Sequence, residues 1–138
     1  MRNWFISIGL LATLFFSVTA IAEGPNQKRA VSAFTLKSGT LDGKRVFIGV
    51  GGKIDGKINP ALFVKEWEVV EITLINMDGL PHHIALPDFF ILSPEIKEMS
   101  QKTMISFVPF KSGGFPYYCG LEGHRQLGME GQIVILHQ

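Results

Sequence analysis

Short runs of alternating apolar and polar residues, separated by turn-forming residues, constrain this chain more than any other feature of its sequence. The clearest run is Trp67–Ile75, in which Glu68, Val70, Ile72 and Leu74 share one parity and therefore one face of a strand. We assign that face to the core. Similar runs lie at Val31–Leu36, Arg45–Val50, His82–Leu86, Thr103–Val108, Phe115–Cys119 and Gln132–Leu136.

Turn residues between these runs decide the fold class. The chain has 15 glycines and 7 prolines in 138 residues, which favours β structure over a helical bundle. We therefore predict an all-β fold, an antiparallel Greek-key sandwich or small barrel of about seven or eight strands. Only Ser93–Ser100 resembles a helix, with Ser93 as its N-cap and Pro94 at its first position. We expect the aromatic residues Trp67, Phe107, Phe110 and Phe115 in the core.

Residues 1–22 are predicted to be a signal peptide rather than part of the fold. Arg2 precedes an apolar run, and Ala20-Ile21-Ala22 resembles a signal peptidase site. The alternative is an uncleaved membrane anchor, since the run approaches the ~20 residues that span a bilayer. Either way, residues 23–138 form a single domain outside the cytoplasm, in the periplasm or otherwise exported.

Charge and cysteine content exclude several classes of protein. The net charge is +1 and there is no long run of Lys or Arg, so we expect no nucleic-acid binding. With 46% hydrophobic residues, the chain is not a disordered segment. Its single cysteine permits no internal disulfide. An exported protein gains little from a free thiol that is open to oxidation, so we expect the sulfur to be occupied.

The region around that cysteine has the composition of a metal site. Cys119, His124 and Met129 follow a C-x4-H-x4-M spacing in a loop between two predicted strands. A thiolate, an imidazole and a thioether form a soft ligand set that suits copper in both of its common oxidation states. Backbone N–H groups within residues 120–124 are the expected hydrogen-bond donors to the sulfur.

A further ligand is expected from another part of the chain, where His82 and His83 begin a predicted strand. His82 shares its parity with Ile84 and Leu86, the larger apolar residues, and should point inward. We therefore choose His82 as the ligand.

Other functions for these residues are less consistent with the sequence. A buried structural cysteine leaves the matching His and Met spacing unexplained. A Cys–His nucleophile has no use for a methionine, and methionine is a poor ligand for zinc. A catalytic copper site of another type needs additional histidines, and only His83 and His137 remain. We predict that the protein is not an enzyme.

The segments NMDGLPHHIALPD and FPYYCGLEGHRQLGMEGQIVI resemble the two copper-binding segments of the cupredoxins, the type 1 (blue) copper electron carriers. Plastocyanins and amicyanins share the general arrangement, and the loop length is similar to that of rusticyanin and auracyanin. The chain also resembles cupredoxin modules attached to copper nitrite reductases. The resemblance covers about residues 45–137.

This resemblance implies one copper ion held by His82, Cys119, His124 and the axial Met129. It implies single-electron transfer between exported partners such as a c-type cytochrome, a copper oxidase or a nitrite reductase, by a monomer that meets a membrane only through a retained N-terminal segment. A copper carrier for an oxidase and an accessory subunit docked on a larger oxidase or reductase are the alternatives. Many members have Asn or Ser where this chain has His83, which either stiffens the cysteine loop as Asn does or faces solvent.

Overall fold

The computed structural model describes residues 29–138, so the predicted signal peptide at residues 1–22 lies outside the described residues. The described part contains two short 3-10 helices, η1 (Gly52–Ile54) and η2 (Pro87–Phe89). Its strands are β1 (Val31–Leu41), β2 (Lys44–Val50), β3 (Leu62–Lys65), β4 (Val69–Ile75), β5 (Ala85–Leu86), β6 (Ile91–Leu92), β7 (Lys102–Phe107), β8 (Gly113–Tyr118) and β9 (Glu130–Leu136). Among these residues no helix is long and apolar enough to cross a membrane.

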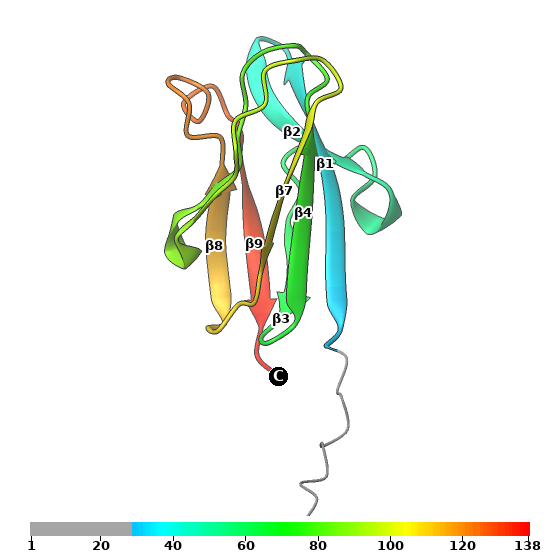
Figure 1. Ribbon diagram of the computed structural model, residues 1–138, viewed down its shortest axis with the longest axis vertical. Helices are drawn as coiled ribbons and strands as arrows, with labels where there is room; N and C mark the ends of the chain where they lie inside the picture. Colours follow the sequence, from blue (N-terminus) through cyan, green and yellow to red (C-terminus); the bar gives the residue numbers. More distant parts are fainter. Residues whose placement is uncertain (1–28) are drawn as a thin grey trace, which may run out of the picture.

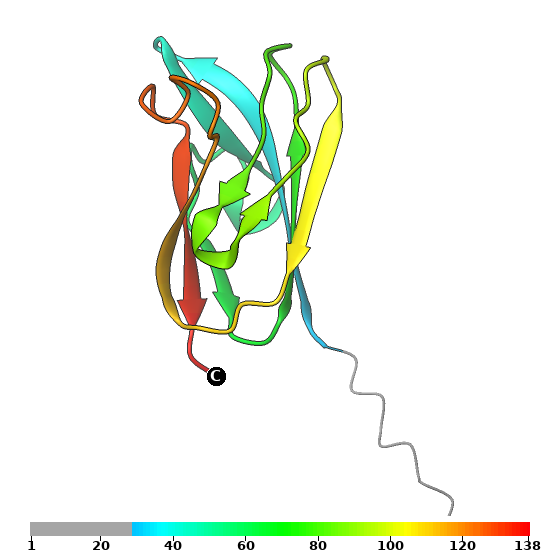
Figure 2. The ribbon, with the colours of Figure 1, turned by 60° about the vertical axis from the view of Figure 1, so that its left-hand side comes forward.

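The strands form two sheets packed face to face, which confirms the predicted β-sandwich (Figures 1 and 2). One sheet has the order β2-β1-β4-β7 and the other has the order β3-β9-β8-β5-β6. The predicted antiparallel arrangement holds for the other strand pairs but not for two of them, because β1 pairs with β4 and β3 pairs with β9 in parallel. Parallel neighbours need long connections, and both pairs join segments far apart in the sequence.

The alternation in β4 was interpreted correctly. Val70, Ile72 and Leu74 are completely buried between the sheets. The strand starts later than predicted, because Trp67 has a left-handed backbone (φ 65°) in the preceding turn and is 52% exposed. Phe110 is also exposed, at 53%, so the prediction that both aromatic residues lie in the core was wrong. Phe107 and Phe115 do pack against the core.

The predicted helix at Ser93–Ser100 is also wrong. The segment contains no helix: Ile96 forms an antiparallel bridge with His82 through two backbone hydrogen bonds of 2.8 Å, and residues 98–100 form a turn. The Ser93 hydroxyl accepts a hydrogen bond from the Ile84 N–H instead of capping a helix. Tertiary pairing therefore overrides a favourable local helix start.

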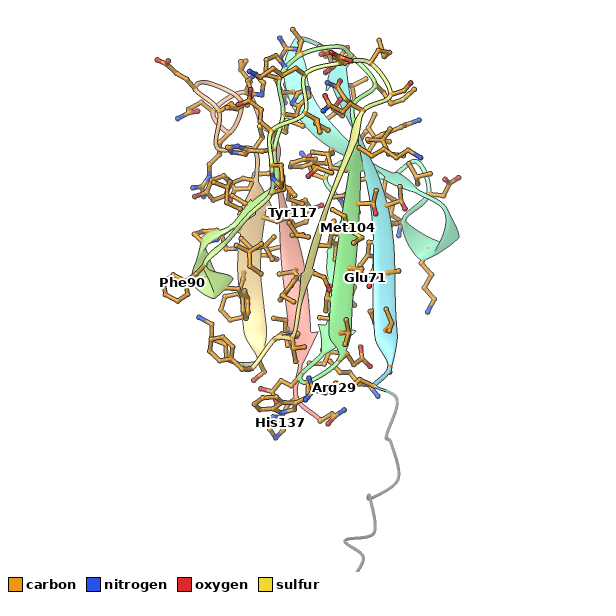
Figure 3. All side chains as sticks on the ribbon, in the orientation of Figure 1. Arg29, Glu71, Phe90, Met104, Tyr117 and His137 are labelled. Atoms are coloured by element: carbon orange, nitrogen blue, oxygen red, sulfur yellow. The ribbon has the colours of Figure 1, made fainter. Side chains whose placement is uncertain are left out.

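The two ends of the sandwich carry different features. Figure 1 shows the connections between β8 and β9 and between β4 and β5 at one end, whereas β1 begins and the chain terminates at the other. Figure 3 shows Tyr117 inside the sandwich, and Arg29 and His137 at the end where β1 begins. His137 is exposed, as predicted, and its Nδ1 lies 2.8 Å from a carboxylate oxygen of Glu66.

Candidate metal centre

The hairpin formed by β8 and β9 positions the predicted metal-binding loop. Cys119 directly follows β8, and Met129 directly precedes β9. The Cys119 N–H donates a 3.1 Å hydrogen bond to the Met129 carbonyl, which extends the β8–β9 pairing by one step. The Met129 N–H donates to the His124 carbonyl at 3.0 Å. These two bonds hold the ends of the loop together and place His124 beside them.

The structure brings three of the four predicted ligands into one cluster. The potential ligand atoms of His82, Cys119 and His124 all lie within 4.8 Å of one another. The Cys119 Sγ is 3.4 Å from His124 Nδ1, and the rings of His82 and His124 have centroids 5.1 Å apart. His82 and Cys119 are completely buried, whereas His124 is half-buried. The Met129 side chain is also completely buried.

His82 is held in an orientation that leaves one ring nitrogen available. Its Nε2 lies 2.7 Å from Asp78 Oδ1, so Nε2–H donates to the carboxylate. Its Nδ1 is buried and has no hydrogen-bond partner in the described part of the chain. A buried nitrogen without a partner is costly unless a ligand occupies it. This arrangement fits a metal bound at Nδ1, with the carboxylate fixing the tautomer of the ring.

Asp78 is itself held by its surroundings. Burial alone would raise the pKa of Asp78, but hydrogen bonds from His82, the Leu80 N–H and Ser38 outweigh burial and lower it. The carboxylate is therefore ionised when it accepts the hydrogen bond from His82 Nε2–H. Ser38 reaches Asp78 from β1, at 3.2 Å. The sequence analysis missed Asp78, whose only signal is its position four residues before His82 in an Asn-x-Asp-Gly turn.

The Asn76 side chain builds that turn. Its Oδ1 accepts hydrogen bonds from the backbone N–H groups of Asp78 and Gly79, and its Nδ2 donates to the Leu80 carbonyl at 2.7 Å. Asn76 is completely buried at the end of β4. Such side-chain to backbone bonds are the usual way that Asn stabilises a turn. The turn carries Asp78 back toward His82.

Burial keeps the Cys119 thiol protonated in the absence of a cation. Burial raises its pKa, while backbone N–H groups of His83 and Leu121 hydrogen-bond to the sulfur and partly offset the increase. The Leu121 donor lies within the predicted range, residues 120–124, whereas the donor from His83 was not predicted. Burial and the nearby His82 and Arg45 lower the pKa of His124, which favours the neutral ring that can coordinate a metal.

His83 stiffens the cysteine loop, which is the first of its two predicted roles. Its Nε2 accepts a 2.7 Å hydrogen bond from the Gly120 N–H, across the gap between the two ligand-bearing segments. Because Nε2 accepts, the ring is neutral, and burial lowers the pKa of His83 in agreement with this. The parity argument is also correct: His82, Ile84 and Leu86 are completely buried and His83 is only half-buried.

Comparisons with known proteins identify the fold. No family model matches the chain, and no curated protein matches it in sequence. Rusticyanin from Thiobacillus ferrooxidans is similar in structure, with 21% identity, a TM-score of 0.55 and 79% of each chain covered. Auracyanin A, a "blue" copper protein from Chloroflexus aurantiacus, has 14% identity and a TM-score of 0.57, and the match covers 78% of this chain and 100% of that one.

Larger copper enzymes match over part of their length only. The multicopper oxidase McoA from Aquifex aeolicus has 19% identity and a TM-score of 0.57, and the match covers 78% of this chain and 26% of the oxidase. This chain therefore spans about a quarter of that enzyme. At these identities the likeness establishes the fold alone. The chemistry of the site follows from the cluster of His82, Cys119 and His124.

Proposed function

We propose that this chain, a β-sandwich with the cupredoxin fold, is a type 1 copper protein that transfers single electrons. The observation that carries the proposal is the buried His82–Cys119–His124 cluster, in which the ligand atoms lie within 4.8 Å of one another and His82 Nδ1 has no hydrogen-bond partner within residues 29–138. Two imidazoles and one thiolate, with a thioether nearby, form the donor set that selects copper. Rusticyanin and auracyanin A, which match over most or all of their length, support a small carrier rather than an enzyme.

In this proposal His82 Nδ1, Cys119 Sγ and His124 Nδ1 would hold one copper ion, and the Met129 thioether would supply a weaker contact. Copper, when bound, supplies a one-electron couple between Cu(I) and Cu(II). The protein residues keep the ligands nearly fixed while the charge changes. Asp78 holds the His82 ring, two backbone N–H groups hold the Cys119 sulfur, and the β8–β9 hairpin holds the loop. Ligands that move little need little reorganisation during transfer.

His124 is the proposed point of electron entry and exit. It is the only half-buried member of the His82–Cys119–His124 cluster, whereas the other two are shielded from water. Leu127, which is 46% exposed, lies in the same loop, and an ion pair between Arg125 and Glu130 lies beside it. A small apolar contact with charged neighbours suits a partner that docks briefly and dissociates. We propose an exported partner, such as a c-type cytochrome, a copper oxidase or a nitrite reductase.

Adding one equivalent of Cu(II) to the purified protein tests the proposal. We expect an intense visible band from the thiolate bond and a small copper hyperfine splitting in the EPR spectrum, with the band bleached by ascorbate. A weak band with a large splitting, or no stable Cu(II) complex, would remove the electron-carrier function and favour a copper-delivery protein. A delivery protein would also lose its copper quickly to a competing chelator, whereas an electron carrier should retain it.

Replacing Asp78 by Ala should weaken copper retention by roughly 10- to 100-fold, because the His82 ring loses the carboxylate that orients it. Copper retention by Asp78→Asn should lie between that of the wild type and that of Asp78→Ala, since the amide oxygen accepts the same bond without a charge. The measurement is competition with a Cu(I) chelator. Asp88→Ala is the matched control: it also removes a carboxylate, but one that pairs with Lys111 away from the cluster. Equal affinities for Asp78→Ala and Asp88→Ala would contradict a role for Asp78.

A further inference from the structure

Asn59 is tied to β2 through both its backbone and its side chain. Its N–H donates a 2.7 Å hydrogen bond to the Phe47 carbonyl, and its Oδ1 accepts a 2.9 Å bond from the Phe47 N–H. Its backbone is left-handed (φ 45°), a conformation that Asn tolerates better than most residues. Phe47 is completely buried in the core. The orientation of the Asn59 side chain is therefore fixed by a rigid strand.

With Oδ1 engaged, the amide nitrogen of Asn59 points at the loop that carries the proposed ligands. Asn59 Nδ2 donates a 2.8 Å hydrogen bond to the carbonyl oxygen of Gly128, 69 residues away in the sequence. A second tether lies beside it, because the Arg45 N–H donates to the Leu127 carbonyl at 3.1 Å. Two successive carbonyls of the loop are thus held from β2, one directly and one through Asn59.

The Gly128–Met129 peptide group is clamped on both of its polar sides. Its oxygen accepts from Asn59 Nδ2 and, within the loop, from the Glu130 N–H, and its N–H donates to the His124 carbonyl. A peptide group is planar, so fixing both its oxygen and its N–H fixes the direction in which the chain enters Met129. The Met129 carbonyl in turn accepts from the Cys119 N–H. Asn59 is thereby linked to all three ligand-bearing positions of the loop.

The neighbouring residue, Pro60, is held by a second strand, β8. The Tyr117 hydroxyl, buried in the core, donates a 2.7 Å hydrogen bond to the Pro60 carbonyl. Tyr117 lies on β8, two residues before Cys119. Residues 59–60 therefore contact both the strand that leads into the loop and the loop itself. No other described side chain outside the loop has a hydrogen bond to the Gly128–Met129 peptide group.

We propose that Asn59 is a positioning residue that sets the place of Met129 relative to Cys119 and His124. This inference rests on the proposed function, because Met129 matters only as a metal contact. Withdrawing an axial thioether removes electron donation that Cu(II) needs more than Cu(I) does. Loss of the hydrogen bond from Asn59 to the Gly128 carbonyl is therefore expected to raise the reduction potential and to change the relative intensities of the visible bands.

Asn59→Gly is the principal test, because glycine keeps the left-handed backbone and removes both side-chain hydrogen bonds without adding charge. We expect a raised potential and altered band intensities in the copper-loaded protein. In the metal-free protein, amide exchange at Met129 should accelerate by about tenfold, because the peptide group that carries its N–H loses the bond from Asn59 Nδ2, which is worth about 1.4 kcal/mol. Asp55→Ala is the control: it removes the Asp55 bond to the Gly51 N–H in the same connection but does not reach the loop.

A double-mutant cycle separates positioning from general destabilisation. In a Met129→Leu background, Asn59→Gly should cause no additional change in potential. An equal change in both backgrounds would overturn the proposal, and so would an Asn59→Gly protein with the potential and spectrum of the wild type. If Asn59→Gly fails to fold, Asn59→Asp retains the bond from Phe47 and loses the donor to Gly128; unchanged band intensities there would overturn it.

The two proposals fail in different ways. A wild-type protein without a type 1 spectrum removes the proposed function and this inference with it. A wild-type protein with that spectrum, combined with Asn59 variants that leave potential, band intensities and Met129 exchange unchanged, removes this inference alone.

Discussion

Replacing Cys119 by Ala should abolish the intense visible absorption of the copper-loaded protein completely. The band requires a thiolate bound to the metal, and the chain contains 1 cysteine, so no other residue can replace it. The fold should survive, because Cys119 behaves as a small buried side chain and its loss costs about 1 kcal/mol. The measurement is an absorption and EPR titration with Cu(II), paired with a thermal unfolding curve of the metal-free protein.

Cys119→Ser sharpens this experiment. The serine hydroxyl can accept the hydrogen bonds that the backbone N–H groups of His83 and Leu121 give to the sulfur, so the buried donors keep a partner. Any copper that binds should then show a weak band and a large hyperfine splitting. An intense band in either variant would refute the assignment of Cys119 as the ligand.

Gly131→Ala should be strongly destabilising. Gly131 on β9 lies directly opposite Tyr117 on β8, and a Cβ atom there would collide with the Tyr117 ring and hydroxyl. The ring has no space to move, because Tyr117 is completely buried and its hydroxyl donates to the Pro60 carbonyl. Overpacking of this kind costs about 3 kcal/mol, which lowers the unfolding midpoint by roughly 10 °C.

Gly114→Ala is the matched control on the neighbouring strand. A Cβ at Gly114 would make only ordinary contact, 3.7 Å from the Gln132 side chain, so the change should cost less than about 1 kcal/mol. Calorimetry of both metal-free variants checks the difference. Equal unfolding midpoints would show that the Tyr117 ring can move aside and that the segment at Pro60 is less constrained than the hydrogen bond indicates.

The parts of this molecule that were predictable from sequence have a repeating or fixed spacing. The alternation of Val70, Ile72 and Leu74 identified the buried face of a strand, and the same parity rule distinguished His82 from His83. The C-x4-H-x4-M spacing indicated a loop joined to two strands, and Cys119 and His124 do lie together with His82. These features depend on local geometry, which the sequence encodes directly.

The features that escaped prediction depend on distant partners. The four residues of β3 give too short a pattern, and the strand exists through its parallel pairing with β9. Ser93–Ser100 has good helix-starting residues, but pairing between Ile96 and His82 prevents a helix there. Asn59 has no recognisable motif, because it acts through a hydrogen bond to the Gly128 carbonyl, in a segment that only the folded chain brings close. Asp78 is the exception: it lies only four residues before His82, but that spacing alone does not reveal that its carboxylate holds the ring.

The separation of the two ends of the sandwich has a consequence for attaching this protein to a conducting surface. The chain ends at the opposite end of the sandwich from the loop that carries Cys119 and His124 (Figure 1). The intervening strand β9 has 7 residues, a length of about 23 Å at about 3.3 Å per residue. If the protein were tethered to an electrode through its C-terminus, His124 would face the solution. The electrode would then be too distant from His124 to exchange electrons efficiently. Adsorption through the end that carries Cys119 and His124 would instead bring the proposed copper site against the electrode.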